Sequence, residues 1–521
     1  MKRMLCSGVL ALFLATVPVF AQSPIPDFFE GPQVQPEVVG TQRDVSAKAA
    51  EMQQLHQRLT AARVAKALTQ PIVLQLAPTE REQIDDTSRV EQKYQVGVSR
   101  DVNKAVNFSA ARSLGSRTTT LDLGAARGTG DGGFVWTAAV RVPGASALRL
   151  HLTGVDLGGS ALYVYNSEGQ AFGPYTGRGP LGTGEVYTNT VFGDELLVQL
   201  HAAANSERAP RLTLEAVGVM GARFAVPRYG REGVNNSFDT SKALCSVNAS
   251  CIVNAACQSG TAVNIAKDAI AGILYASGAS YYICTGGLIA DSVTTSVIPL
   301  FLTANHCVNT SGEAASVETY FDYGTTCSNP NCAQPYNNAG ETVGATLLYA
   351  SSTSDVSLLR LSATPTTPDG VATYLGWTAT PVANTNNAPL YRISHPSGSP
   401  QSYTEGVVDT TKGTCRSLPR GNFIYSRDTL GATEGGSSGA PVVNGSGQVV
   451  GQLYGACGTN LNDVCDAANN GTVDGAFAVS YTGLAPFLNP SSGGSCSAVG
   501  VSCTSNGQCC SNKCKGGRCK S

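Results

Sequence analysis

The chain has 521 residues, which is more than one ordinary domain holds, so we expect roughly two to four domains. Only 14% of the residues are charged, and 58 glycines and 25 prolines favour a turn-rich β protein over a helical cytosolic one. A formal net charge of −2 gives no sign of a nucleic-acid partner, and we expect none.

Residues 1–21 have the pattern of an export signal. Lys2 and Arg3 precede an apolar run over residues 5–20, and the Val-Phe-Ala sequence that ends at Ala21 suits signal peptidase. A membrane anchor is the alternative, but the run is short for a span, and we identify no other segment that could cross a bilayer. We therefore expect a secreted, extracellular protein without a membrane segment after the signal is removed.

The cysteine count predicts disulfides. Removing the signal removes Cys6 and leaves 16 of the 17 cysteines, an even number in an exported chain. Metal ligation is the alternative, but the chain has five histidines and no Cys-x-x-Cys pair beside one. We expect neither a metal site nor a cofactor.

The part of the chain before the cysteines divides into two segments. Residues 22–93 are predicted to be a disordered and helical pro-segment. Within it, residues 22–44 are rich in proline and glutamine, whereas residues 46–68 have the apolar spacing of one helix face. Residues 94–226 contain short alternating runs separated by glycine-rich turns, which predicts an antiparallel β-sandwich.

The remainder divides into four segments. Residues 227–244 are polar and contain arginine and lysine, which is typical of a linker and a processing zone. Residues 245–490 form a cysteine-containing β block, and residues 491–495 are a Ser/Gly linker. Residues 496–521 hold six cysteines, and so small a segment needs disulfides because it cannot bury a core.

Two adjacent serines stand between glycines in the segment ATEGGSSGAPV at residues 432–442. Ser437 fits the G-x-S-x-G pattern of an α/β-hydrolase, but that fold places its histidine after the serine, and His395 is the last histidine of the chain. Ser438 fits the order histidine, aspartate, serine, so we take Ser438 as the nucleophile.

A serine nucleophile needs a base and an orienting acid. His306 ends an apolar strand beside a cysteine and is a better base than His395, which lies among turn residues. A structural histidine at a strand end is the alternative for His306. Asp355 precedes the apolar run VSLLRL, and we interpret the other aspartates between His306 and Ser438 as ordinary loop residues: Asp322, Asp369, Asp409 and Asp428.

These segments carry a family resemblance. FLTANHC, TSDVSLLRL and TEGGSSGAPVV resemble the active-site segments of trypsin/chymotrypsin-like serine proteases, and in particular those of bacterial lysyl endopeptidases. The similarity extends to CSVNASC, YYICTGGLI, YLGWT and VVGQLYG, and covers roughly residues 240–490. It implies an all-β protein with two packed six-stranded β-barrels and a site in the cleft between them.

The resemblance also implies roles for individual residues. Ser438 attacks the scissile carbonyl, His306 takes the serine proton and returns it to the leaving amine, and Asp355 holds the imidazole. The backbone N–H groups of Gly436 and Ser438 form an oxyanion hole. The substrates are proteins or peptides, and a catalytically silent binding protein on the same scaffold is the alternative.

The resemblance further suggests disulfides. It implies that Cys284–Cys307 brackets the base and suggests Cys245–Cys457 and Cys251–Cys327. Four cysteines stay unassigned: Cys257, Cys332, Cys415 and Cys465. The spacing C-x6-C-x5-C-C-x3-C-x4-C of the tail resembles the inhibitor cystine knot (knottin) family, which implies Cys496–Cys510, Cys503–Cys514 and Cys509–Cys519. Such a module could bind a surface or the protease domain.

The substrate pocket is predicted from position alone. The candidates are Ala432, Thr433, Tyr454, Gly455 and Asp474. Ala432 stands where trypsin has its charge-reading aspartate, six residues before the nucleophile. Gly471 or Thr472 falls at the place of the lysyl endopeptidase aspartate, and Asp474 lies nearby. P1 is the substrate position just before the cleaved bond. These residues allow a preference for lysine or another basic residue at P1 but do not establish it.

The activation switch of trypsin is absent. Ser437 replaces the aspartate that pairs with the new N-terminus in trypsin, so another part of the chain must keep the enzyme silent or help it to fold. We expect the region over roughly residues 22–240 to act as a propeptide and to be a partner of the protease domain. An independent binding domain is the alternative.

Overall fold

The computed structural model describes residues 31–489, except residues 43, 45, 87–92, 205–207, 225–243, 246, 294–297, 328–341, 366, 368 and 416, together with residues 502 and 514–520. Contacts group Gly31–Ser521 into one compact unit, whereas Met1–Glu30 is a separate unit outside the described residues. The expected signal peptide, nearly all of the linker at 227–244 and most of the C-terminal module also lie outside them.

The first described segment contacts strands from the other end of the chain. The short strands β1 (Gln33–Val34) and β2 (Glu37–Gly40) pair with β23 (Gly376–Thr378) and β22 (Val371–Tyr374). The predicted disorder of residues 22–44 is therefore wrong for residues 33–40. Local composition does not reveal partners that lie so far along the chain.

Helices lead into the first domain. The predicted helix over 46–68 is α1 (Ser46–Ala62) followed by the 3-10 turn η1 (Lys66–Leu68), and α1 buries Met52 and Leu59. The helix α2 (Pro78–Asp85) was not predicted, although Pro78 and Glu80 stand where a helix start favours them.

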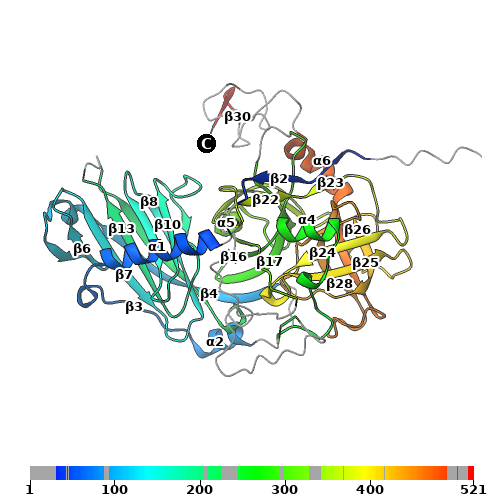
Figure 1. Cartoon of the computed structure of the whole chain (residues 1–521), viewed down its shortest axis with the longest axis horizontal. Coiled ribbons are helices and arrows are strands. Elements are labelled where there is room, and N and C mark those ends of the chain that lie inside the picture. Colours follow the sequence, from blue (N-terminus) through cyan, green and yellow to red (C-terminus); the bar gives the residue numbers. More distant parts are fainter. Residues whose placement is uncertain are drawn as a thin grey trace, which may run out of the picture. The chain divides into compact units, whose positions relative to one another are not determined.

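Residues 94–220 form two antiparallel sheets around a shared apolar core (Figure 1). One sheet has the order β10-β9-β13-β7-β6-β5, with β3 beside β7, and the other has the order β11-β8-β14-β4, with β12 beside β8. Trp136 is fully buried in this core. The bounds are β3 Ile72–Val73, β4 Tyr94–Asn107, η2 Ser109–Ser113, β5 Thr118–Thr120, β6 Ala125–Gly128, β7 Phe134–Arg141, β8 Ala147–Asp156, β9 Ala161–Tyr165, β10 Ala171–Thr176, β11 Val186–Tyr187, β12 Val191–Phe192, β13 Glu195–Ala202 and β14 Arg211–Met220.

Six strands of the next segment follow the order β19-β16-β17-β18-β21-β20 and pack around a second apolar core. Phe301 and Phe321 are fully buried there, in edge-to-face contact with ring centroids 6.0 Å apart. The bounds are β15 Val253–Asn254, η3 Ala255–Cys257, α4 Thr261–Ala269, β16 Ile270–Ser277, β17 Ser280–Leu288, β18 Leu300–Ala304, α5 Ser311–Ser316, β19 Glu318–Phe321, β20 Ala345–Ser351 and β21 Val356–Leu361.

Six strands between residues 389 and 476 close into an antiparallel barrel in the order β24-β25-β26-β29-β28-β27 and back to β24 (Figure 1). Trp377 packs against Phe477 and Tyr481 of α6. The expected all-β fold class is thus confirmed. The bounds are β24 Pro389–Ser394, η5 Pro396–Gly398, β25 Ser402–Val408, β26 Phe423–Leu430, β27 Pro441–Val443, β28 Gln448–Gly458, β29 Asn470–Ala476, α6 Phe477–Leu488, β30 Cys514–Lys515 and β31 Arg518–Cys519.

One strand joins the first domain to the cysteine-containing β block of residues 245–490 (the protease-like block). β4 pairs with β14 on one side and, over residues 94–98, with residues 280–283 of β17 on the other. Beside this junction Glu318 of β19 is fully buried, and its carboxylate accepts hydrogen bonds from the backbone N–H and the Oγ1 of Thr190, at 2.9 and 2.6 Å. Arg149 is also fully buried, with Nε 3.7 Å from Glu318 Oε2.

The structure corrects part of the disulfide prediction. Cys284 is joined to Cys307, with sulfur atoms 2.01 Å apart. Cys457 is joined to Cys415 instead of Cys245, and Cys251 is joined to Cys465 instead of Cys327. Cys327 pairs with Cys257, and Cys245 is disulfide-bonded as well. The pairings Cys496–Cys510, Cys503–Cys514 and Cys509–Cys519 involve residues outside the described ones, and Cys332 lies outside them as well.

None of the helices in the described ranges is long and apolar enough to cross a membrane.

Candidate active site

His306 and Asp355 meet at the ends of two neighbouring strands. His306 follows β18 and Asp355 precedes β21, and these strands pair antiparallel from Leu300 to Ala304. The Nδ1 atom of His306 lies 2.7 Å from Oδ2 of Asp355, and the backbone N–H of His306 donates to Oδ1 at 2.8 Å. Both side chains are largely withdrawn from water, with 15% and 6% exposure. One carboxylate therefore fixes both the position and the ring orientation of the histidine.

The same contact sets the tautomer of His306. A carboxylate that faces Nδ1 accepts a hydrogen bond from an N–H at that nitrogen, so the ring proton stays on Nδ1 and the lone pair is left on Nε2. Nε2 is buried and has no hydrogen-bond partner among the described residues. The imidazole can therefore accept a proton at Nε2 from a neighbouring hydroxyl.

Ser438 is 5% exposed, and its backbone lies close to the residue that follows His306. Its carbonyl oxygen accepts a hydrogen bond from the backbone N–H of Thr285 at 2.8 Å. The Sγ of Cys307, the residue after His306, lies 3.7 Å from the same oxygen. The structure thus brings the predicted nucleophile to the chain segment that carries the predicted base.

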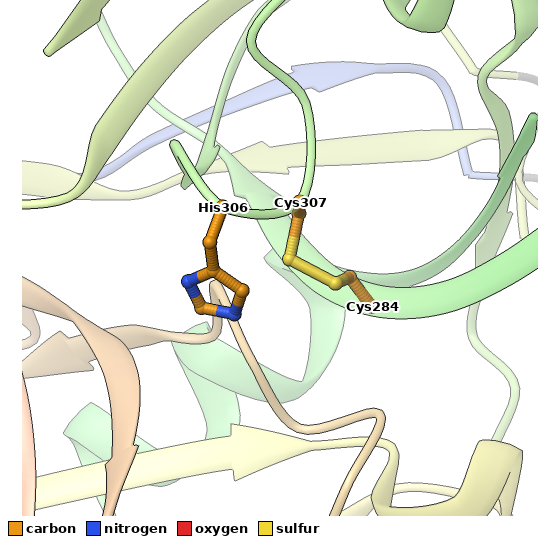
Figure 2. Close-up of side chains that lie close together, drawn as sticks. All are labelled: Cys284, His306 and Cys307. Carbon is orange, nitrogen blue, oxygen red and sulfur yellow. A yellow bond between two sulfur atoms is a disulfide. The ribbon is translucent and has the colours of Figure 1, made fainter. Parts of the chain in front are cut away.

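The disulfide beside His306 decides how the nearby sulfur atoms are interpreted. The Cys284 and Cys307 sulfurs and the His306 ring form a group whose possible ligand atoms lie within 4.8 Å of one another (Figure 2). Both sulfurs are consumed by the disulfide bond, and a metal would need them as thiolates. The disulfide therefore fixes the chain segment that carries His306, and its sulfur atoms are not available as metal ligands.

The backbone N–H groups of Gly436 and Ser438 point away from the groups that hydrogen-bond to the loop before Ser438. The carbonyl of Gly435 accepts from Ser397 N–H at 2.7 Å, and the carbonyl of Ser437 accepts from Ala440 N–H at 3.1 Å. In a trans peptide the next N–H points opposite to the carbonyl, so the N–H groups of Gly436 and Ser438 are turned away from these partners. Neither donates to another group in the described part of the chain.

The loop conformation requires glycine at residue 436. Its φ is +98°, a region that L-residues with side chains rarely adopt. A Cβ atom there would lie 2.8 Å from the carbonyl oxygen of His395. The Oγ1 of Thr285 donates to the Gly436 carbonyl at 2.9 Å, which is a positioning contact that the sequence analysis missed.

The two alternative site residues lie beneath this loop. Ser437 is fully buried, and its Oγ accepts from Ser394 Oγ at 3.0 Å. His395 is 1% exposed, with Nδ1 2.9 Å from the carbonyl oxygen of Ser399, and its ring stacks on Tyr323. Both side chains support the loop from within the protein.

A second missed residue, Glu434, holds the loop from the other side. Its Oε1 accepts from Ala249 N–H at 2.7 Å, and its Oε2 accepts from Asn248 Nδ2 at 2.8 Å and from Ser397 Oγ at 3.1 Å. Glutamate directly before two glycines in the nucleophile segment was a visible signal. The first residues of the protease-like block are thus tied to the loop that presents Ser438.

The predicted pocket residues separate into two groups. Thr433 lines a cavity beside β28 and β29, and Gly455 has open space where a Cβ would lie. The ring of Tyr454 makes an edge-to-face contact with His306, with centroids 5.5 Å apart. Ala432 instead packs with Ile252, and its carbonyl accepts from a threonine hydroxyl.

Asp474 does not face the cavity. Its side chain is fully buried, and its two carboxylate oxygens accept from Nε and Nη2 of Arg392, the first at 2.9 Å. A different aspartate, Asp428 of β26, lines the cavity. Burial raises the pKa of Asp428, against the opposing attraction of Arg392.

Comparisons with known proteins find a family model that matches part of this block and relatives that align with more than half of the chain. Residues 245–470 match the family model for the lysyl endopeptidase C-terminal domain. A lysyl endopeptidase of Pseudomonas aeruginosa is 31% identical over 326 residues, which cover 60% of this chain and 65% of that protein. Secreted RxLR effector protein 73 of Plasmopara viticola is 28% identical over 287 residues, which cover 53% of this chain and 65% of that protein.

Among solved structures, the active form of the Rv3671c protease from M. tuberculosis aligns with a TM-score of 0.29 and 18% identity, over 44% of this chain and 85% of that one. The chain spans 65% of the length of each of the two sequence relatives. The range that matches the family model begins at Cys245, the residue at which sequence composition begins the cysteine-containing β block.

Proposed function

We propose that the chain is a serine endopeptidase that cleaves peptide bonds through an acyl-enzyme, with Ser438 as nucleophile, His306 as base and Asp355 as orienting acid. The observation that carries the proposal is the double contact of Asp355 with His306, 2.7 Å to Nδ1 and 2.8 Å to the backbone nitrogen. The similarity of residues 245–470 to lysyl endopeptidases supports the same reaction class.

The proposed mechanism assigns a step to each of these residues. His306 Nε2 accepts the hydroxyl proton as Ser438 Oγ attacks the scissile carbonyl carbon, and the imidazolium is stabilised by Asp355. The oxygen of the tetrahedral intermediate is stabilised by the N–H groups of Gly436 and Ser438. The imidazolium gives its proton to the leaving amine, and water then hydrolyses the acyl-enzyme by the same proton transfers.

A covalent serine reagent tests the proposal. Diisopropyl fluorophosphate should modify the purified protein on Ser438 and stop casein cleavage in parallel, and mass spectrometry of the peptides identifies the modified residue. A His306→Ala variant should be labelled at a rate reduced by several orders of magnitude, because the hydroxyl then lacks its base. Casein cleavage that persists after full modification of Ser438, or a native protein that neither reacts nor cleaves, contradicts the proposal.

We further propose that the N-terminal region is a propeptide of the protease domain. It supplies β4 as a neighbour of β17, and Arg149 and Thr190 as neighbours of the buried Glu318. The backbone hydrogen bonds between β4 and β17 link two segments that are distant in the chain. A domain bound in this way can guide the folding of the strands that carry His306.

Replacing Glu318 with glutamine is expected to lower the free energy of unfolding of the full chain by about 3 kcal/mol, because the buried Arg149 then keeps its charge without a carboxylate. Urea titration measures the change, and the recovery of casein cleavage after refolding should fall with it. The control is Asp194→Asn, which breaks a solvent-exposed pair with Arg141 and should cost less than about 1 kcal/mol. Equal effects of the two substitutions would contradict the role assigned to Glu318.

We also propose that the protein is exported and made as a precursor. The leader pattern at residues 1–21 and the basic linker at 227–244 support this, as do the disulfides of the protease-like block. N-terminal sequencing of the secreted protein gives the processing sites.

A further inference from the structure

One buried amide connects the two six-stranded sets beside the candidate site. Gln452 of β28 is fully buried, and its Nε2 donates to the backbone carbonyl of Ser354 at 2.6 Å and to that of Asp355 at 3.2 Å. β28 belongs to the closed barrel, whereas Asp355 precedes β21 of the set β19-β16-β17-β18-β21-β20. A side chain of the closed barrel therefore contacts the other strand set at the residue proposed as the orienting acid.

The same stretch of β28 is bonded to the chain just after the proposed nucleophile. The N–H of Leu453 donates to the carbonyl of Ala440, and the N–H of Gly439 donates to the carbonyl of Leu453, both at 2.8 Å. Gly439 directly follows Ser438. Two adjacent residues of one strand thus hold the nucleophile segment through the backbone and the segment of Asp355 through a side chain.

The backbone of Asp355 has a conformation that needs support. Its φ is +54°, in the left-handed region that residues with side chains rarely adopt, although aspartate is found there more often than most. Such a conformation persists only when its surroundings fix it. The Asp355 carbonyl accepts from the backbone N–H of Asn305 at 2.9 Å as well as from Gln452. Donors from both strand sets therefore hold the backbone that aims the carboxylate at His306.

The neighbouring strand leaves room for this amide. Gly475 of β29 is the partner of Gln452 in the register of β28 and β29. A Cβ atom at residue 475 would overlap the carbonyl oxygen of Ser354 and the Nε2 atom of Gln452. The contact between Gln452 and Ser354 therefore requires a residue without a side chain at position 475.

The other end of the Gln452 amide adds little to stability. Its Oε1 is buried and has no hydrogen-bond partner within the described residues. A buried acceptor without a donor costs free energy, which offsets part of the gain from the two bonds of Nε2. We therefore expect Gln452 to matter more for the position of Asp355 than for the free energy of unfolding.

We propose that Gln452 is a positioning residue of the protease, which fixes the backbone of Asp355 relative to the strand that holds the Ser438 segment. This inference rests on the proposed endopeptidase function and adds a residue to it. Without the amide, Asp355 and His306 can shift together relative to Ser438, and the transfer of the proton from Oγ to Nε2 becomes slower.

The first test replaces Gln452 with methionine, which has a similar length and no N–H donor. The kcat for a fluorogenic peptide should fall roughly 10- to 100-fold, as expected for a small misplacement of reacting groups. KM should change by less than about threefold, because the loss falls on the transition state.

The matched control is Gln401→Met. Gln401 is also buried, and its Nε2 also donates to two backbone carbonyls, those of Lys267 and Ile270, at 2.6 and 3.5 Å. None of these residues has a role in the proposed mechanism, so kcat should stay unchanged within about twofold. Equal losses of kcat from Gln452→Met and Gln401→Met would overturn the proposal.

A double-mutant cycle separates a positioning role from a general structural one. If Gln452 acts through Asp355, adding Gln452→Met to a protein that already carries Asp355→Asn should lower kcat by less than about a further twofold. A side chain that only supports the fold would lower kcat by the same factor in both backgrounds. That result, or wild-type kcat for Gln452→Met alone, contradicts the proposal.

Two further measurements keep the outcomes distinct. If diisopropyl fluorophosphate does not modify Ser438 of the wild-type protein, the endopeptidase function itself fails. If it modifies the wild-type and Gln452→Met proteins at the same rate, only the role of Gln452 is overturned. Should Gln452→Met not fold, as judged by its urea midpoint, Gln452→Asn takes its place. This variant keeps the amide but is one methylene shorter, and the same loss of kcat is expected.

Discussion

Replacing Ser438 with alanine is expected to abolish peptide-bond cleavage, with kcat lowered by about 10⁶-fold, because no other group can form the acyl-enzyme. The His306–Asp355 pair and the turned N–H of Gly436 do not depend on this hydroxyl, so the folded protein should persist. A fluorogenic peptide assay on the purified variant measures the loss. The urea midpoint shows that the fold is retained.

The adjacent serine is the matched control. Ser437 is fully buried, and its Oγ accepts a hydrogen bond from Ser394 Oγ. Ser437→Ala should therefore lower kcat by less than about tenfold, through a small change in the loop. Comparable losses from both substitutions would mean that the hydroxyl of Ser438 is not the nucleophile. Full activity of Ser438→Ala would end the enzyme interpretation.

Replacing Asp355 with asparagine should lower kcat by about 10⁴-fold. The amide keeps the shape of the carboxylate, but its NH2 group can stabilise the tautomer of His306 that carries the proton on Nε2. That tautomer cannot take a proton from Ser438. The rate of Ser438 modification by diisopropyl fluorophosphate should fall in parallel, while KM should change little because Asp355 lies behind the imidazole.

Another aspartate between His306 and Ser438 provides the control for Asp355. Asp409 forms a weak pair with Arg427, at 3.8 Å, and its Oδ1 accepts from Thr411. Asp409→Asn should therefore leave kcat unchanged within about twofold. A loss below tenfold for Asp355→Asn would show that His306 does not need this acid for catalysis.

Much of the fold could be predicted because its signals are local. Alternating apolar residues predict the strands of the first domain, and the spacing of Met52 and Leu59 predicts α1. The strand at residues 33–34 could not be predicted in the same way, because its hydrogen bonds go to Trp377 and Thr378. The correct partner of Cys457 was missed for a related reason, since disulfide pairing depends on which turns meet in space.

The candidate site shows the same division. His306 ends an apolar run, Asp355 precedes one and Ser438 stands between glycines, and the three follow a required order, so the sequence alone predicts them as a set. Asp428 and Asp474 look alike in the sequence, and only the buried Arg392 separates them, because it binds Asp474 through two hydrogen bonds and leaves Asp428 at the cavity. The sequence does not indicate which of the two aspartates forms hydrogen bonds with Arg392.

The position of β4 between β14 and β17 has a further consequence for a chain that is cut after this domain. If the first domain departs, residues 280–283 keep β16 on one side and expose a row of unsatisfied amide and carbonyl groups on the other. Such an open sheet edge can pair with an extended peptide or with a second copy of the protein, which promotes aggregation. In the released protease, the edge that the first domain had covered would then be the surface most prone to self-association.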